Sequence, residues 1–99
     1  LNLNGVESSI TIGADGLALI SYRYWNLANN DLKVAHCSNT ACTSSTTSTI
    51  DSDGSVGTDT SITIGADGLG LISYNDWFND DLKVAHCDNA FCSPYFRRR

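Results

Sequence analysis

Two pairs of cysteines are the residues of this chain whose type and spacing most directly indicate chemistry. Cys37 and Cys42 enclose four residues, and Cys87 and Cys92 repeat that spacing. A four-residue hairpin turn places its flanking residues opposite one another, within reach of a disulfide bond. Of the three pairings that four cysteines allow, Cys37–Cys42 with Cys87–Cys92 is the most economical. Such bonds indicate an oxidising compartment, so we expect a secreted, extracellular protein.

A histidine precedes the first cysteine of each pair, which makes a metal site the alternative. His36 and His86 would supply one ligand per repeat, and with two cysteines the set is still short of the four ligands of structural zinc. Along a strand, His36 also points to the face opposite Cys37. We therefore predict no metal and no cofactor, and expect both histidines to pack against apolar neighbours. The expected neighbours are Leu32, Val34, Leu82 and Val84.

Aromatic side chains flanked by amides and carboxylates form a second group of candidates, in segments 23–30 and 75–80. Aromatic rings can cover the apolar face of a sugar while polar groups take its hydroxyls, so this composition favours carbohydrate binding. The alternative is that each tryptophan fills the gap between packed sheets, with its indole N–H satisfied locally. The predicted ligand-binding residues are Tyr24, Trp25, Asn26, Asp76, Trp77 and Asn79.

Three aspartates, Asp51, Asp53 and Asp59, lie close together in the chain and raise a calcium site as an alternative. Segment 51–59 lacks the register and the bidentate glutamate of an EF-hand loop, and Asp and Gly also form ordinary turns. No nucleophile elbow, phosphate loop or zincin motif occurs in the sequence. We therefore expect a protein that is not an enzyme.

These candidates occur twice because the chain is an internal repeat. Segment 9–22 returns at 61–74 with one difference, Ala18 against Gly70, and segment 31–37 returns unchanged at 81–87. The two segments are spaced differently in the two copies, so residues were gained or lost between them, which predicts a surface loop there. We divide the chain into repeat 1 (residues 1–50) and repeat 2 (residues 51–99), which together form one structural unit.

Each repeat is predicted to contain four β-strands. Segment 9–12 alternates polar and apolar residues, Asp15-Gly16 predicts a tight turn, and 17–22 and 32–37 give two further strands. The Ser- and Thr-rich segment 43–50 is either an exposed outer strand or a disordered linker, and the flanking hairpins favour the strand. In an antiparallel meander the aromatic segments and segment 51–59 then share one end of the sheets.

The combination Ile-Gly-Ala-Asp-Gly, Ile-Ser-Tyr and Asp-Leu-Lys-Val-Ala-His-Cys resembles the tandem repeats of secreted bacterial proteins with sialidase- and lectin-like β-propeller blades. This resemblance implies an all-β protein built from two four-stranded antiparallel blades. Segment 17–22 has apolar residues on both faces, which also favours a blade packed between neighbours. A two-sheet β-sandwich is the alternative.

Charge and length restrict the partners. The net charge is −5, and Arg97, Arg98 and Arg99 supply half of the six basic residues, so the body of the chain is strongly acidic and nucleic-acid binding is disfavoured. No apolar run approaches the roughly 20 residues of a membrane span. Because propellers have four to eight blades, we expect self-association. The chains would form either a closed ring that presents glycan-binding residues or an extracellular structural polymer without a small ligand.

Overall fold

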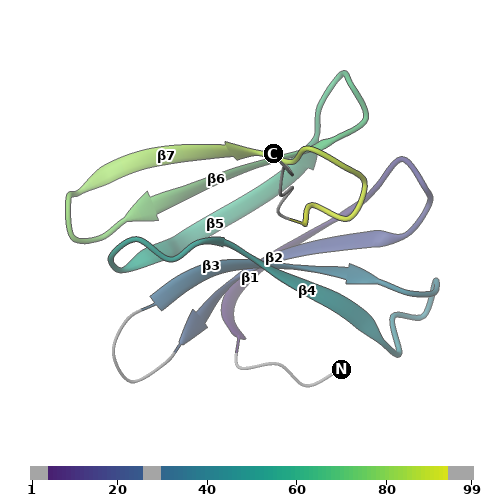
Figure 1. The fold of residues 1–99 in the computed structure, drawn as a ribbon, viewed down its shortest axis with the longest axis horizontal. Helices are drawn as coiled ribbons and strands as arrows, with labels where there is room; N and C mark the ends of the chain where they lie inside the picture. The colour runs from purple at the N-terminus through teal and green to yellow at the C-terminus, as the bar shows by residue number, and fades with distance from the viewer. Residues whose placement is uncertain (1–4, 26–29, 94–99) are drawn as a thin grey trace, which may run out of the picture.

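The computed structural model describes residues 5–25 and 30–93, and within this range every regular element is a β-strand. Each repeat forms one open antiparallel sheet whose strands follow chain order (Figure 1). The all-β prediction is confirmed. No helix in the described ranges is long and apolar enough to cross a membrane. The strands are β1 (Gly5–Ile12), β2 (Ala18–Trp25), β3 (Asn30–Cys37), β4 (Ser45–Asp51), β5 (Val56–Ile64), β6 (Gly70–Asp76) and β7 (Asp81–His86).

The Ser- and Thr-rich segment of repeat 1 is a strand. It forms β4, which among the described strands pairs with β3 alone and lies at the edge of the four-stranded sheet. Its short polar side chains suit a strand with one unpaired edge, because an apolar edge would invite further strand pairing. In the described residues the sheet of repeat 2 has three strands, and a counterpart of β4 would begin at residue 95, outside the described residues.

The predicted tight turn after the first strand of each repeat is present. Gly13 N donates to Leu17 O at 2.8 Å, and Gly16, with φ of +82°, takes the left-handed conformation that suits glycine. The Asp15 carboxylate accepts a hydrogen bond from Leu17 N at 3.0 Å and closes the turn from the side. Repeat 2 has the same bonds at Gly65, Asp67 and Leu69.

The cysteine connection is longer than the sequence predicted. Cys37 pairs with Ser45 across the β3–β4 ladder, so the connection spans residues 38–44 and Cys42 lies inside it, with φ of +55°. The prediction of a four-residue turn with the two cysteines facing each other on paired strands was wrong. A local turn, closed by Cys42 N donating to Asn39 O at 3.1 Å, brings the two Cα atoms to 4.8 Å instead.

Strand pairing fixes which side chains share a face, since paired residues point to the same side and neighbours alternate. Ser21 pairs with Val34, and these residues define face A of repeat 1. Ile10 pairs with Ile20, and these residues define face B. Face A carries Thr11, Leu19, Ser21, Leu32 and Val34 in repeat 1, and Thr63, Leu71, Ser73, Leu82 and Val84 in repeat 2. Face B carries Ser8, Ile10 and Ile20 in repeat 1, and Thr60, Ile62 and Ile72 in repeat 2.

The two sheets pack as two layers, face A of repeat 1 against face B of repeat 2 (Figure 1). Strand β5 lies over β1, β2 and β3. Leu32 and Val34 join Ile62 and Ile72 in one buried cluster. At Gly57, with φ of +98°, a Cβ atom would lie 3.2 Å from Asp31 O, so glycine allows β5 to approach the backbone at the start of β3.

Two polar contacts fix how the layers lie on one another. The Thr60 hydroxyl donates to the Ser21 hydroxyl oxygen at 3.0 Å in a buried position, and Ile62 N donates to Ser9 Oγ at 3.2 Å. A buried hydroxyl without a partner costs about 1–3 kcal/mol, so these pairs favour this particular arrangement over a shifted one.

Candidate functional site

Two ends of the layered sheets differ in character. The β1–β2, β3–β4 and β5–β6 connections lie at one end, together with the loop after β7, and we call this the stapled end because it holds both disulfides. The β2–β3, β4–β5 and β6–β7 connections lie at the other end, on the left of Figure 1, which we call the loop end. The meander therefore places the segments expected to bind ligand at one end.

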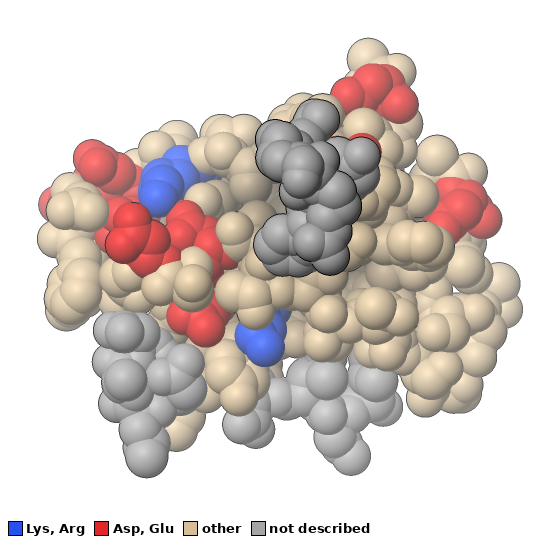
Figure 2. Space-filling view, in the orientation of Figure 1, with Lys and Arg blue, Asp and Glu red and all other residues tan. Residues whose placement is uncertain are grey.

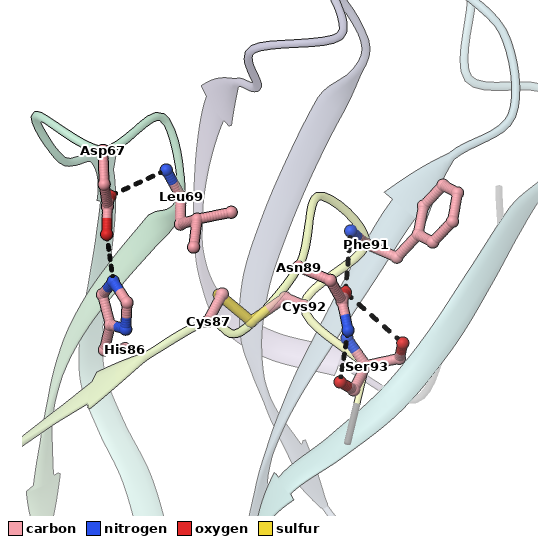
Figure 3. The surroundings of a disulfide bond; sticks show 8 residues. All are labelled: Asp67, Leu69, His86, Cys87, Asn89, Phe91, Cys92 and Ser93. Carbon is pink, nitrogen blue, oxygen red and sulfur yellow. Dashed lines mark hydrogen bonds and ion pairs between the residues drawn. A yellow bond between two sulfur atoms is a disulfide. The ribbon is translucent and has the colours of Figure 1, made fainter. Parts of the chain in front are cut away.

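The stapled end is held by disulfides. The bonds are Cys37–Cys42 and Cys87–Cys92, the pairing that the sequence favoured. In the loop after β7, the Asn89 side-chain oxygen accepts from Phe91 N and Ser93 N, at 3.0 and 3.2 Å (Figure 3). The side chain of Asn89 therefore forms its hydrogen bonds within its own loop.

Each histidine of the stapled end is bonded to an aspartate of the neighbouring turn. His36 Nε2 lies 2.8 Å from Asp15 Oδ2, and His86 Nε2 lies 2.7 Å from Asp67 Oδ2 (Figure 3). In each turn the hydrogen bond from the leucine N–H lowers the pKa of the aspartate, Asp15 or Asp67, and the hydrogen bond with the histidine lowers this pKa further. His36 shares face A with Leu32, as expected, and its ring also meets Phe91 edge-on at 4.4 Å. We interpret these pairs as structural.

The described residues hold no group of three or more His, Cys, Asp or Glu side chains placed to bind a metal ion. Asp51, one of the three calcium candidates, accepts hydrogen bonds from the Tyr74 hydroxyl at 2.7 Å and from Lys83 Nζ at 3.0 Å. Asp59 instead accepts from Asn75 Nδ2 at 3.3 Å. The carboxylates of segment 51–59 thus bond different partners.

The Asp51 contact joins the two sheets at the loop end, since Asp51 ends β4 while Tyr74 and Lys83 lie on β6 and β7. Burial raises the pKa of the Asp51 carboxyl, but hydrogen bonds from Tyr74, from Asp53 N and from Lys83 outweigh burial and lower it. Burial raises the pKa of Tyr74, and the Asp51 carboxylate raises it further. The same carboxylate raises the pKa of Lys83. In Figure 2, acidic side chains gather at this end of the molecule, and a basic patch lies among them.

A cleft of about 260 Å³ opens at the loop end between the two repeats. Repeat 1 supplies Arg23 and Asn30, at the facing ends of β2 and β3, and repeat 2 supplies Ser55, Thr58 and Trp77. The Trp77 side chain is 69% exposed, which leaves its ring available to a ligand.

Hydrogen bonds position the walls of this cleft. Trp77 N donates to Ser55 O at 2.9 Å, and Asn30 Nδ2 donates to Ser55 Oγ at 3.0 Å. Among the described residues, two buried polar atoms of the cleft residues make no hydrogen bond: Asn30 Oδ1, and Arg23 Nε, which forms an ion pair with Glu7 Oε1 at 3.5 Å. Both atoms lie beneath the surface, so they do not face the open cleft.

The predicted ligand-binding residues fall in different places. Trp77 lines the cleft, whereas Trp25, the exposed last residue of β2, pairs with the cleft residue Asn30. Tyr24 lies under Lys33 Nζ, 4.1 Å from the ring centroid. Asn26 lies outside the described residues.

Asp76 and Asn79 are bonded to each other, which gives them a positioning role. Asp76 is buried, and its carboxylate accepts from Asn79 N at 3.3 Å and from Asn79 Nδ2 at 2.7 Å. This bonding closes the turn that follows β6 and so fixes Trp77, which lies between them in the chain. The Asp76 carboxylate is thus occupied by the turn.

The sequence-based selection did not single out four of the cleft residues, namely Arg23, Asn30, Ser55 and Thr58. Each lies within or next to a segment assigned to the loop end, 23–30 or 51–59. The available signal was therefore their location at that end. What the sequence could not show is which of these polar side chains face each other across the boundary between the repeats.

Comparison with protein-family models, with curated proteins and with solved structures finds no match for this chain.

Proposed function

We propose that this chain is a secreted, non-enzymatic binding module that takes carbohydrate in the cleft between its two repeats. The observation that carries the proposal is the strongly exposed Trp77 ring in one cleft with the polar side chains of Arg23, Asn30, Ser55 and Thr58. A cleft that offers hydrogen-bond donors and acceptors beside an exposed ring suits a ligand group that both accepts and donates.

A sugar hydroxyl is such a group. It can accept a hydrogen bond from the side chain of a cleft residue such as Arg23 and donate its own hydrogen to a neighbouring oxygen. The hydroxyls of Ser55 and Thr58, in the same cleft, offer further donors and acceptors to a polyhydroxylated ligand.

Trp77 supplies the apolar part of such recognition. Its ring covers the C–H face of a pyranose, while the bonded pair Asp76 and Asn79 keeps the turn in one conformation and lowers the entropy lost on binding. Trp25, beside Asn30 in the ladder, extends the aromatic surface for a longer glycan.

A glycan array followed by calorimetry on the strongest binder tests the proposal. Trp77→Ala is expected to weaken binding at least about tenfold, since truncation of an aromatic anchor costs about 2 kcal/mol or more. Phe78→Ala is the matched control, because Phe78 is an equally exposed neighbour that does not line the cleft. A silent array across broad glycan classes, or a Trp77→Ala variant with unchanged affinity, would contradict it.

Other features support the rest of the proposal. Two disulfides in a 99-residue chain are compatible with an oxidising, extracellular location. Open antiparallel meanders, each packed by one face on the next repeat, are the arrangement expected of consecutive β-propeller blades. This arrangement supports our proposal that the two sheets are such blades.

A second candidate function is supported by a different observation. Large apolar side chains remain exposed on both outer faces of the layered sheets, including Ile10, Ile12, Leu82 and Val84. Exposed apolar sheet faces of this kind suit an extracellular structural protein that self-assembles into a ring or filament. A protein that stays monomeric at high concentration would rule this function out.

A further inference from the structure

Repeat 2 exposes the side chains of face A that repeat 1 buries. Leu32 and Val34 are 0% exposed, whereas their counterparts Leu82 and Val84 are 73% and 65% exposed. The residue types are the same in both repeats, so the difference comes from packing alone. Repeat 2 covers face A of repeat 1, and nothing in the described part of the chain covers Leu82 and Val84.

Face B shows the reverse relation. Ile62 of repeat 2 is 6% exposed, whereas its counterpart Ile10 of repeat 1 is 63% exposed. Likewise, Ile64 packs against the core while its counterpart Ile12 is exposed. Face A of repeat 2 and the β1 side chains on face B of repeat 1 therefore present exposed apolar groups that match the internal contact, whereas Tyr22 on face B of repeat 1 is buried.

The free face A of repeat 2 is hollowed where a partner would lie. A groove of about 250 Å³ is lined by Leu71, Ser73 and Val84, among others. Their counterparts in repeat 1, Leu19, Ser21 and Val34, bury the same surface against repeat 2. Burial of the apolar side chains on the free face A against another molecule would therefore give a hydrophobic gain similar to that of the internal contact.

The polar contacts of the internal contact also have counterparts on the free faces. Inside the chain, Ser21 accepts a hydrogen bond from the Thr60 hydroxyl. Ser73 is the counterpart of Ser21 on the free face A, and Ser8, which also carries a hydroxyl, is the counterpart of Thr60 on the free face B. In the second internal contact Ile62 N donates to Ser9 Oγ. The matching groups on the free faces are Ile10 N, as the donor, and the Ser61 hydroxyl, as the acceptor. Both hydrogen bonds can thus form between chains.

From these matched faces we infer that face A of repeat 2 binds face B of repeat 1 of a second copy of this chain, in the arrangement that already joins the two repeats. Two different surfaces meet, so the contact is heterologous and continues from chain to chain until a ring closes or a filament grows. The inference rests on the second candidate function, which it deepens by naming the surfaces, and does not depend on carbohydrate binding.

Light scattering behind size exclusion, on non-reduced protein over a concentration series, measures this association. The covalent link within one chain gives its internal contact an effective concentration on the order of millimolar, so the series should extend to about 1 mM. We expect the mass to rise from 10.6 kDa in steps of whole chains.

Two single variants and their mixture identify the surfaces. Val84→Asp blocks face A of repeat 2, and Ile10→Asp blocks face B of repeat 1, so each variant alone is expected to stay monomeric. A one-to-one mixture still has one intact surface of each kind and is expected to form a dimer that grows no further. A contact between like faces would instead leave one variant able to dimerise alone.

Both side chains are exposed, so the substitutions leave the fold intact, which circular dichroism checks. Leu82→Asp and Ile12→Asp form a second pair with the same expected results, and Phe78→Asp, outside both faces, is the control that should associate like the wild type. A monomeric wild type at about 1 mM would overturn both the inference and the second candidate function. Association that Val84→Asp and Ile10→Asp leave unchanged would overturn the inference alone.

Discussion

Gly70 is the residue at which segment 61–74 differs from segment 9–22, where Ala18 stands. A Cβ atom at residue 70 would lie 2.8 Å from Cys87 Sγ and 3.6 Å from Ile62 Cδ1. The sulfur cannot withdraw easily, because it is buried and bonded to Cys92. Close packing within repeat 2, against Cys87 and Ile62, thus explains the glycine at this position.

Gly70→Ala is therefore expected to destabilise the protein by about 1–3 kcal/mol, the usual cost of overpacking a buried site. The reverse change in repeat 1, Ala18→Gly, is the matched control, with an expected loss of about 0.5–1 kcal/mol from backbone entropy. Urea unfolding of non-reduced protein measures both free energies. Equal losses in the two variants would contradict the steric explanation.

Asp51 gives the protein an acid-sensitive contact between its two sheets. The hydrogen bonds that lower its pKa below 3.8 stabilise the ionised form in the folded state. The stabilisation is consequently present above pH 3.8 and is lost as the pH falls through the lowered folded pKa. Asp15 and Asp67, whose pKa values are also lowered, change stability in the same direction.

Asp51→Asn is expected to reduce the free energy of unfolding at neutral pH by about 1–2 kcal/mol, since hydrogen bonds to a charged group are replaced by weaker ones. The variant should also lose less stability than the wild type between about pH 5 and pH 2. Thermal unfolding across this range provides the measurement. Asp53→Asn is the control, because the Asp53 side chain makes neither the Tyr74 nor the Lys83 contact. If both variants follow the wild-type pH profile, Asp51 is not the acid-sensitive group.

The two disulfide loops are equal in length but not in surroundings. Cys87 and Cys92 both belong to the buried cluster between the sheets, whereas Cys42 of repeat 1 is only half-buried. Each bond closes a loop of the same sequence separation, so loop closure contributes about 2 kcal/mol in either repeat.

Replacing both Cys87 and Cys92 by alanine is expected to cost at least about 1 kcal/mol more than the same change at Cys37 and Cys42, because it also leaves a cavity in the core. Denaturant midpoints of the two double variants give the comparison. A larger loss for the repeat 1 variant would show that the sulfur atoms of Cys87 and Cys92 contribute little to packing.

Most strands could be predicted because their signals are local. Alternation in segment 9–12, the Asp15-Gly16 turn and the gain or loss of residues between the repeated segments all mark features of one repeat. The cysteine connection was mispredicted because hydrogen bonds to Asn39, and not the Cys37–Cys42 spacing, determine the path of its backbone.

The candidate cleft was predictable as an end of the molecule but not as a set of residues. Trp77 was predicted to bind ligand because it is an aromatic residue flanked by polar residues, and segment 51–59 was assigned to the same end of the sheets. The facing of Asn30 and Ser55 depends on how one sheet lies over the other. That relation follows from packing between residues far apart in sequence, which a periodic pattern does not encode.

At the scale of the whole molecule, one covalent crossing, residues 52–55 between β4 and β5, connects two sheets that share no strand. Neither sheet alone covers the apolar face that it turns to the other, so each repeat is expected to be unfolded in isolation.

Separate fragments 1–53 and 54–99 are accordingly expected to show little β-structure by circular dichroism and to regain it on mixing. Leu32→Asp in the first fragment should abolish this recovery, because Leu32 is fully buried between the sheets. Phe78→Asp in the second fragment is the control that should leave it intact. A fragment that folds alone would show that the layers are independent units.

The use of face A by repeat 1 and face B by repeat 2 gives the molecule a direction, which a twofold dimer lacks. A line of chains joined as inferred ends in Ile10 and Ile12 at one terminus of the line and in Leu82 and Val84 at the other. The two termini then differ in what they can recruit. A surface that captures one of them would orient every later chain the same way, so that the clefts of a growing layer repeat at regular intervals along it.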